Sequence, residues 1–131
     1  RILQVEQFCL VESFSIQNNH VQSVGPLPAS SESMTHGAIY AAHSGVHCVI
    51  HVHSRIVFDH LLQTGAPATP ADVHYGTPAM AHTVAQLVTR HPHLPTVFAM
   101  AGHDEGVVAY GADTASTLDA LRALLQRIST P

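Results

Sequence analysis

Two histidines stand two residues apart in the apolar segment CVIHVHS, at positions 51 and 53, and this spacing suits the binding of a metal ion. The segment is rich in β-branched residues, which predicts a buried strand. Side chains at positions i and i+2 of a strand point to the same face, so His51 and His53 can both reach one ion at about 2.0 Å. The pair needs a third ligand from elsewhere in the chain.

Spacing alone does not establish a metal site. The chain has 12 histidines among 131 residues, so about one pair with this spacing is expected by chance. A second pair, His91 and His93, lies in RHPHLP, where the prolines predict a surface loop without rigid geometry. Context therefore favours His51 and His53, and the structural alternative for them is a pair of core histidines.

His103 is the candidate for the third ligand. It follows the predicted strand TVFAM in the sequence AGHDEGVVAYG, where the nearby glycines allow the backbone to turn and bring a side chain back over the sheet. Asp104 and Glu105 come directly after it. These two acids are either a solvated turn or a source of carboxylates near the site.

The elements that must position these histidines alternate between strands and helices. The first 25 residues have strand-like alternation on either side of a turn at Asn18, Asn19 and His20. A helix is predicted over residues 31–45, with Ser30 or Ser31 as its N-cap and Gly45 at its end. The strand that carries His51 and His53 follows at residues 47–54.

The second half of the chain continues this order. A short helical turn and a loop rich in Pro, Gly and Thr are expected over residues 58–76. Thr77 and Pro78 then predict the start of a helix over PAMAHTVAQLVTR. Two strands, TVFAM and GVVAY, precede a last helix capped by Asp113 or Thr114. Such an order is typical of an α/β fold in which helices cover the faces of a sheet.

Composition limits the class of protein. A hydrophobic content of 46% in 131 residues predicts one domain, spanning residues 1–131, with a substantial core. The net charge of −4 and only five scattered arginines exclude a basic surface for nucleic acid. No apolar run reaches the roughly 18 residues that span a bilayer, and no leader is recognisable, so a soluble, cytoplasmic protein with no membrane partner is expected. Cys9 and Cys48 are expected to be reduced core thiols.

The chain contains no lysine. Schiff-base catalysis, covalent attachment of pyridoxal phosphate and the phosphate-binding loop GxxxxGK[ST] are therefore all excluded within this chain. Carbonyl chemistry here would need a metal.

Four motifs together resemble the class II aldolase and adducin family. They are SSE at 30–32, HVHS at 51–54, YGTPAM at 75–80 and GHDEGVVAYG at 102–111. The resemblance spans about residues 28–125, and the chain looks like this domain without its N-terminal portion. It implies a three-layer α/β/α fold with a mainly antiparallel central sheet, and usually a homotetramer with active sites at subunit interfaces.

The resemblance also implies roles for individual residues. His51, His53 and His103 match the family's zinc ligands, although another divalent metal remains open. Glu32 matches the acidic residue beside the metal, which in aldolases is a general acid or base. The alternative for Glu32 is a first-turn acid favoured by the helix dipole. Ser30 and Ser31 match substrate-binding positions, although an N-cap explains one of them.

Two departures from the family pattern affect the site. The family usually has a glycine directly after the third histidine, whereas Asp104 and Glu105 intervene here before Gly106. The tyrosine that some aldolases use as a proton donor has no clear counterpart, because Tyr75 belongs to the YGT motif.

Two functions from different classes follow from the resemblance. The first is a zinc-dependent lyase of the aldolase type that acts on a small hydroxy-carbonyl compound, with sugar phosphates as candidates, through a metal-stabilised enediolate. An epimerase, dehydratase or decarboxylase would use related chemistry at the same site. The second is a non-enzymatic assembly module, as in the adducin branch, which keeps the fold without the metal site. The presence of His51, His53, His103 and Glu32 favours the enzyme.

Overall fold

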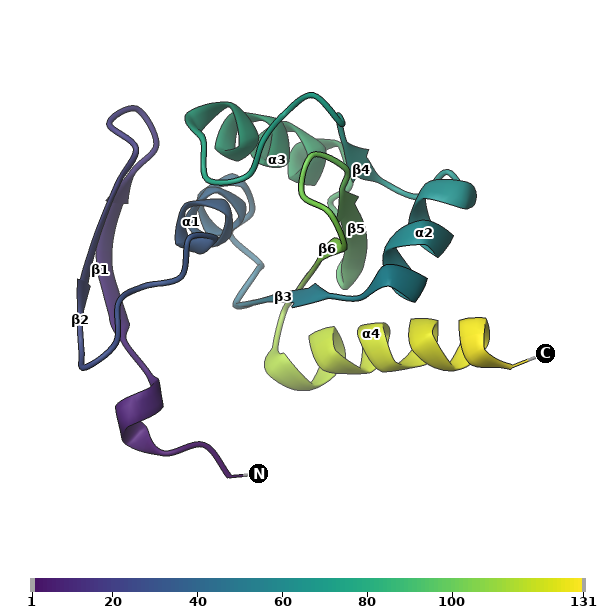
Figure 1. Cartoon of the computed structure of the whole chain (residues 1–131), viewed down its shortest axis with the longest axis horizontal. Helices are drawn as coiled ribbons and strands as arrows, with labels where there is room; N and C mark the ends of the chain where they lie inside the picture. Colours follow the sequence, from purple (N-terminus) through teal and green to yellow (C-terminus); the bar gives the residue numbers. More distant parts are fainter. Residues whose placement is uncertain (1, 131) are drawn as a thin grey trace.

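A four-stranded sheet lies between two layers of helices in the computed structural model, which describes residues 2–130 (Figure 1). Its strands lie in the order β3 (Cys48–His53), β6 (Gly106–Gly111), β5 (Thr96–Met100) and β4 (Ala68–Thr69). The β3–β6 and β6–β5 pairs are antiparallel, whereas β4 joins β5 in parallel. The predicted class, a three-layer α/β/α fold with a mainly antiparallel sheet, is confirmed. Arg1 and Pro131, the two ends of the predicted domain, lie outside the described residues.

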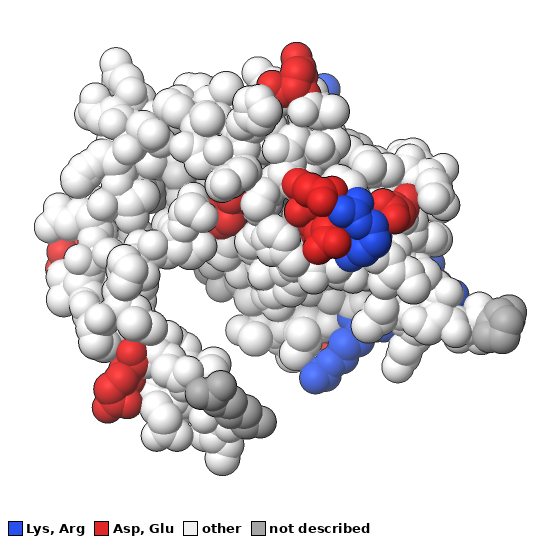
Figure 2. All heavy atoms as spheres, in the orientation of Figure 1, with Lys and Arg blue, Asp and Glu red and all other residues white. Residues whose placement is uncertain are grey.

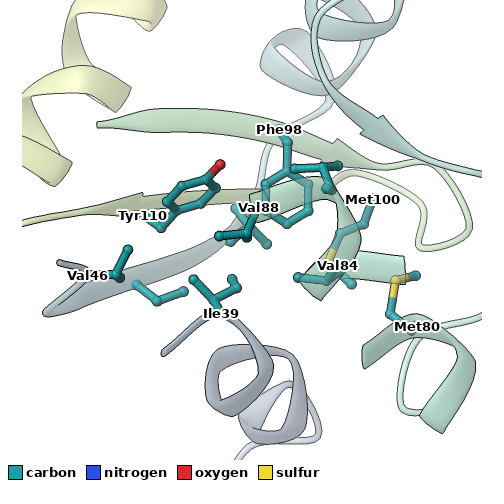
Figure 3. Close-up of a cluster of buried hydrophobic side chains, with 11 residues drawn as sticks. Ile39, Val46, Met80, Val84, Val88, Phe98, Met100 and Tyr110 are labelled. Carbon is teal, nitrogen blue, oxygen red and sulfur yellow. The ribbon is translucent and has the colours of Figure 1, made fainter. Parts of the chain in front are cut away.

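Helices α1 (Ser33–Ala42) and α3 (Pro78–Arg90) cover one face of the sheet, and their apolar side chains meet those of β5 and β6 (Figure 3). Helices α2 (Arg55–Gln63) and α4 (Thr114–Ser129) cover the other face, where a second apolar cluster forms. Because β6 is covered on both faces, all six of its residues are buried. This explains its continuous apolar sequence, since alternation is expected only where one face of a strand meets water.

Capping side chains set the starts of two helices as predicted. The Thr77 side chain accepts a hydrogen bond from the Met80 N–H at the start of α3, where Pro78 occupies the first turn. Asp113, rather than Thr114, does the same for Ser116 at the start of α4. The bounds of α3 are those of the predicted segment.

Helix α1 is shorter than predicted at both ends. Its N-cap position is Glu32, not Ser30 or Ser31, and it ends at Ala42, with His43 as the C-cap residue instead of Gly45. The Ser30 hydroxyl accepts a hydrogen bond from the Glu32 N–H, so it stabilises the turn before the helix. Serine near a helix start indicated a cap, but the Ser30 hydroxyl bonds the N–H of the N-cap residue itself and not an N–H of the first helical turn.

One helix was predicted only in part, and one strand was missed. The short helical turn expected at the start of residues 58–76 belongs to the nine-residue helix α2, which begins at Arg55 and whose N-cap Ser54 accepts a hydrogen bond from the Val57 N–H. The two-residue strand β4 lies in the expected loop. It is defined only by its pairing with β5, so no local pattern could have revealed it.

The predicted N-terminal hairpin is present as a separate two-stranded sheet of β1 (Leu10–Ser15) and β2 (His20–Val24), after a short 3₁₀ turn at Val5–Gln7. Figure 1 shows this hairpin standing against α1, away from the four-stranded sheet. Ile16 and Val21 pack against α1. The expected turn is confirmed, with Asn19 in the left-handed region at φ 48°.

Both cysteines are free thiols in the described part of the chain. Cys48 is buried as expected, whereas Cys9 is only partly buried. No helix within residues 2–130 combines the length and the apolar character that crossing a membrane requires.

Candidate metal centre

The structure brings His51, His53 and His103 together at one end of the sheet. One ring nitrogen from each lies within 4.8 Å of the others. His51 and His53 come from β3, and the β3–β6 register places His53 opposite Gly106. Because His103 lies three residues before Gly106, the pairing of these strands carries it to the end of β3.

Hydrogen bonding at His51 leaves a ring nitrogen free for a metal. Its Nδ1 lies 3.1 Å from the Val107 carbonyl oxygen, which can only accept, so Nδ1 carries the proton and donates it. The neutral ring then has its lone pair on Nε2, which lies 3.2 Å from Nε2 of His53. A backbone carbonyl that orients a histidine in this way is a common feature of metal sites.

Burial lowers the pKa of the His51 imidazole, and the nearby His53 and His103 lower it further. The Glu32 carboxylate and the Val107 hydrogen bond act in the opposite direction, yet the net pKa is below the usual value of 6.5. His51 is therefore held in the neutral form that a metal requires.

Two contacts restrict the His103 ring, and a hydrogen bond holds its backbone. The Tyr75 ring lies over it, with 4.2 Å between the centroids. On another side Gly106 leaves no room, since a Cβ atom there would lie 2.8 Å from Cδ2 of His103. The His103 N–H also donates to the Met100 carbonyl at 2.9 Å, which closes the turn after β5.

A close backbone approach at Gly102 supports the Tyr75 contact. A Cβ atom at Gly102 would lie only 1.7 Å from the carbonyl oxygen of Val73. Only glycine therefore allows the loop before α3 to approach the β5–β6 turn this closely. That loop carries Tyr75, so the glycine helps to place the phenol ring on His103.

Glu32 is buried beside the histidines, with 2% of its surface exposed. Its Oε2 accepts a hydrogen bond from the Thr35 hydroxyl at 2.9 Å, whereas Oε1 has no hydrogen-bond partner among residues 2–130. That oxygen lies 3.9 Å from Nε2 of His103. Leaving a polar atom buried without a hydrogen bond costs about 1–3 kcal/mol, and more if the group is charged. The position suits a proton or a cation as its partner.

The two serines predicted to bind substrate directly precede Glu32 in the chain. Ser30 and Ser31 line a cavity of about 410 Å³ together with Asn19, Ser23 and Gly76. Ser30 also lines a cavity of about 270 Å³ between the hairpin and α1. Both serines therefore line accessible space, and their role in substrate binding stays a prediction.

A comparison with family models now identifies the chain. The model described as "Class II Aldolase and Adducin N-terminal domain" matches residues 2–128. The chain belongs to the class II aldolase and adducin family. No curated protein and no solved structure matches it.

Within this class II aldolase and adducin domain, the donors present fit a metal ion. Three imidazole nitrogens lie close enough to bind one ion, and three histidines with an open fourth position are a common catalytic zinc arrangement. The unpaired, buried Oε1 of Glu32 adds a negative group on the same side. The observed donor set and the family agree.

His36 is a further residue near the site that the sequence analysis did not include. Burial lowers the pKa of its imidazole, the nearby His51 lowers it further, and the Glu32 carboxylate raises it. The His36 backbone N–H also donates to the Glu32 carbonyl at 3.0 Å. A signal existed, because a residue four positions after Glu32 lies on the same helical face.

The other histidine pair, His91 and His93, accepts hydrogen bonds through its backbone carbonyls. The carbonyl of His91 accepts a hydrogen bond from the Tyr110 hydroxyl at 2.6 Å, and that of His93 accepts one from Thr96. Both residues follow α3 in a loop, as predicted. Neither belongs to the group of histidines that lie close enough to hold a metal.

Proposed function

We propose that this protein is a zinc-dependent lyase of the aldolase type that acts on a small hydroxy-carbonyl compound, with sugar phosphates as candidate substrates. The observation that carries the proposal is the cluster of three histidine nitrogens within 4.8 Å, beside a buried carboxylate with an unpaired oxygen. Family members include enzymes and non-enzymatic adducin proteins, and this combination of groups favours an enzyme.

His51, His53 and His103 would hold the ion. A bound zinc ion would supply a Lewis acid that polarises the substrate carbonyl. The fixed tautomer of His51 and the packed ring of His103 would limit how far either ligand can move. Such preorganisation reduces the cost of assembling the site when the ion binds.

Glu32 would move the proton. The Thr35 hydroxyl orients its carboxylate through Oε2, so Oε1 is left to accept a proton from, or return it to, the carbon next to the substrate carbonyl. Burial excludes water that would otherwise compete for this oxygen. A positioned general base of this kind contributes about 10²–10⁴-fold to a rate.

A substrate screen tests this function. Short sugar phosphates and hydroxy acids are incubated with the zinc-loaded protein, and the carbonyl product is followed. Glu32→Gln keeps the size and shape of the side chain but removes the base, so we expect turnover to fall by roughly 100-fold or more with zinc retained. Glu12→Gln, at an exposed position of the hairpin, is the matched control and should behave as wild type.

Two results of the screen would contradict the proposal. Unchanged turnover in Glu32→Gln would remove this residue from the mechanism. A zinc-loaded protein without activity on any such compound would favour the assembly module. Epimerisation, dehydration or decarboxylation in place of carbon–carbon cleavage would change the reaction assigned to the same site.

One observation favours the assembly module as the second candidate. Among residues 2–130, 14 large hydrophobic side chains are exposed, and nine of them lie within residues 2–27. Exposed apolar surface of this kind is typical of interaction sites. A homotetrameric enzyme would bury the same surface between its subunits.

A further inference from the structure

Arg55 connects the two segments that carry the candidate metal ligands. It is the first residue of α2 and stands two positions after His53. Its Nη2 lies 2.5 Å from Oδ2 of Asp104, and its Nε lies 3.3 Å from Oε1 of Glu105. These two acids directly follow His103. Figure 2 shows this cluster as basic atoms surrounded by acidic atoms on the face near α2.

A backbone hydrogen bond joins the same two segments. The Ser54 N–H donates to the carbonyl of Glu105 at 3.1 Å. Glu105 has φ 63°, in the left-handed region that a side chain other than glycine rarely adopts. The turn His103–Gly106 is closed by a hydrogen bond from the Gly106 N–H to the His103 carbonyl at 2.8 Å. The turn therefore holds an unfavourable backbone conformation, and contacts with residues 54 and 55 are available to maintain it.

We propose that Arg55 is a positioning residue that sets the place of His103 relative to His51 and His53. This inference rests on the proposed metal centre. A guanidinium is planar and presents its donors in a fixed fork, so bonds to carboxylates at two successive positions define the orientation of the turn. Orienting the turn orients His103, because the histidine is its first residue.

The exposure of these groups separates positioning from global stability. The Arg55 side chain is 48% exposed and that of Asp104 is 76% exposed, and exposed ion pairs contribute little to the folded state. We therefore expect removal of Arg55 to leave the melting temperature of the metal-free protein nearly unchanged. The effect should be on metal affinity.

A purely electrostatic role makes the opposite prediction for one variant. Arg55 also partly neutralises Asp59, Asp104 and Glu105, and its removal would make the surroundings of a divalent cation more negative. Through charge alone, Arg55→Ala would strengthen zinc binding, and the double variant Asp104→Asn/Glu105→Gln would weaken it. If positioning dominates, both variants weaken it.

The experiment measures zinc dissociation constants by competition with a chelator. Wild type is compared with Arg55→Ala, Arg55→Lys and Asp104→Asn/Glu105→Gln. We expect several-fold weaker binding for Arg55→Ala and for the double variant, because each of the exposed ion pairs that are lost is weak. Arg55→Lys should be intermediate, because an ammonium group is a point charge without the fork. Arg122→Ala, which removes another exposed ion pair, is the matched control and should bind as wild type.

A second measurement reports geometry directly. The absorption spectrum of the cobalt-substituted protein depends on the arrangement of ligands, so it should change in Arg55→Ala and be restored in part in Arg55→Lys. An unchanged spectrum with wild-type affinity in Arg55→Ala, or tighter binding in that variant, would overturn the positioning role and leave the metal centre intact. Failure of the wild type to bind zinc would instead overturn the proposed function.

Discussion

At the scale of single residues, the site depends on which atoms carry protons. The Val107 carbonyl fixes the proton of His51 on Nδ1 and leaves Nε2 directed toward His53. The Thr35 hydroxyl engages one oxygen of Glu32 and leaves the other unpaired. In each of these side chains one polar atom is held by a hydrogen bond within the protein. The other polar atom, Nε2 of His51 or Oε1 of Glu32, lies near a histidine of the site. This division of each side chain between support and chemistry is the basis of the proposed mechanism.

The metal-free protein should lose stability in mild acid. Burial lowers the pKa of His36 and of His51 below the usual value of 6.5. As the pH falls through about 6.5, the unfolded chain therefore takes up protons before the folded chain does. The stability that these residues contribute above this pH is lost as the pH falls toward their folded pKa values.

Urea unfolding of the metal-free protein at several pH values would measure this loss. We expect the free energy of unfolding to decrease between pH 7 and pH 5, by at most about 1.4 kcal/mol per pH unit for each histidine. His36→Gln should make the dependence less steep, whereas His20→Gln, at an exposed position of β2, serves as the control. The same slope in wild type and His36→Gln would show that His36 does not contribute.

Residue types and spacing predicted part of the site. The i, i+2 rule for strands placed His51 and His53 on one face, and the three-histidine cluster has formed with His103. The contacts of Tyr75 and Arg55 were not predicted, because they join segments that are distant in the sequence. His36 did have a local signal, since it lies four positions after Glu32, but the sequence analysis did not use it. The sequence around Tyr75 contains no local sign that its ring lies on His103.

At the scale of elements, strand pairing and one loop crossing bring the site together. The antiparallel β3–β6 pair carries the turn after β5 to the end of β3. The loop before α3 crosses this turn at Gly102, and α1 supplies Glu32 at its start. Each contributing element thus ends or begins at the site, where side chains and loop backbone can be arranged without interrupting the core.

Gly102→Ala should disturb this crossing. The added methyl group would lie 1.7 Å from the Val73 carbonyl oxygen, so the loop carrying Tyr75 must move. We expect a loss of about 2 kcal/mol or more in the free energy of unfolding, with weaker zinc binding. Chemical denaturation and chelator competition would measure the two effects.

Gly65→Ala is the matched control for this prediction. Gly65 has a φ of +68°, which residues with a side chain rarely adopt, but nothing lies within 4 Å of an added Cβ atom. Its substitution should cost about 1–2 kcal/mol from backbone strain alone and leave zinc binding unchanged. Wild-type zinc affinity in Gly102→Ala would contradict the role of the crossing.

Most elements were predictable where local chemistry determined them. The start of α3 follows from Thr77 and Pro78, and that of α4 from Asp113. Helix α2 was underestimated because its first turn follows the histidine strand after a single residue, Ser54. The strand β4 depends wholly on tertiary pairing. Local caps therefore determined the starts of α3 and α4, whereas pairing with a distant segment determined β4.

At the scale of the whole molecule, apolar surface is unevenly distributed. The four-stranded sheet has helices on both faces, while the N-terminal hairpin contacts mainly α1. The hairpin and the segment before it expose large side chains such as Leu10 and Phe8. Side chains of this size lose about 1.5–3 kcal/mol of favourable burial when they stay in water. Association with other copies of the chain would recover this burial.

We predict a homo-oligomer, and specifically a homotetramer. Symmetric assembly is the usual way for identical chains to cover such a surface. Light scattering at micromolar concentration should give four times the mass of the chain. Phe8→Ser with Leu10→Ser should shift the protein toward smaller species, whereas Leu125→Ser, at an exposed position of α4, should not. A monomeric wild type would contradict this prediction.

The most direct test of the metal centre is the zinc content of the purified protein, measured by elemental analysis after zinc loading and removal of excess ion. One ion per chain is expected, because the three candidate ligands surround a single position. His53→Ala should lose the ion, and His93→Ala, from the other histidine pair, should retain it. A zinc content near zero in the wild type, or one ion per chain in His53→Ala, would contradict the account.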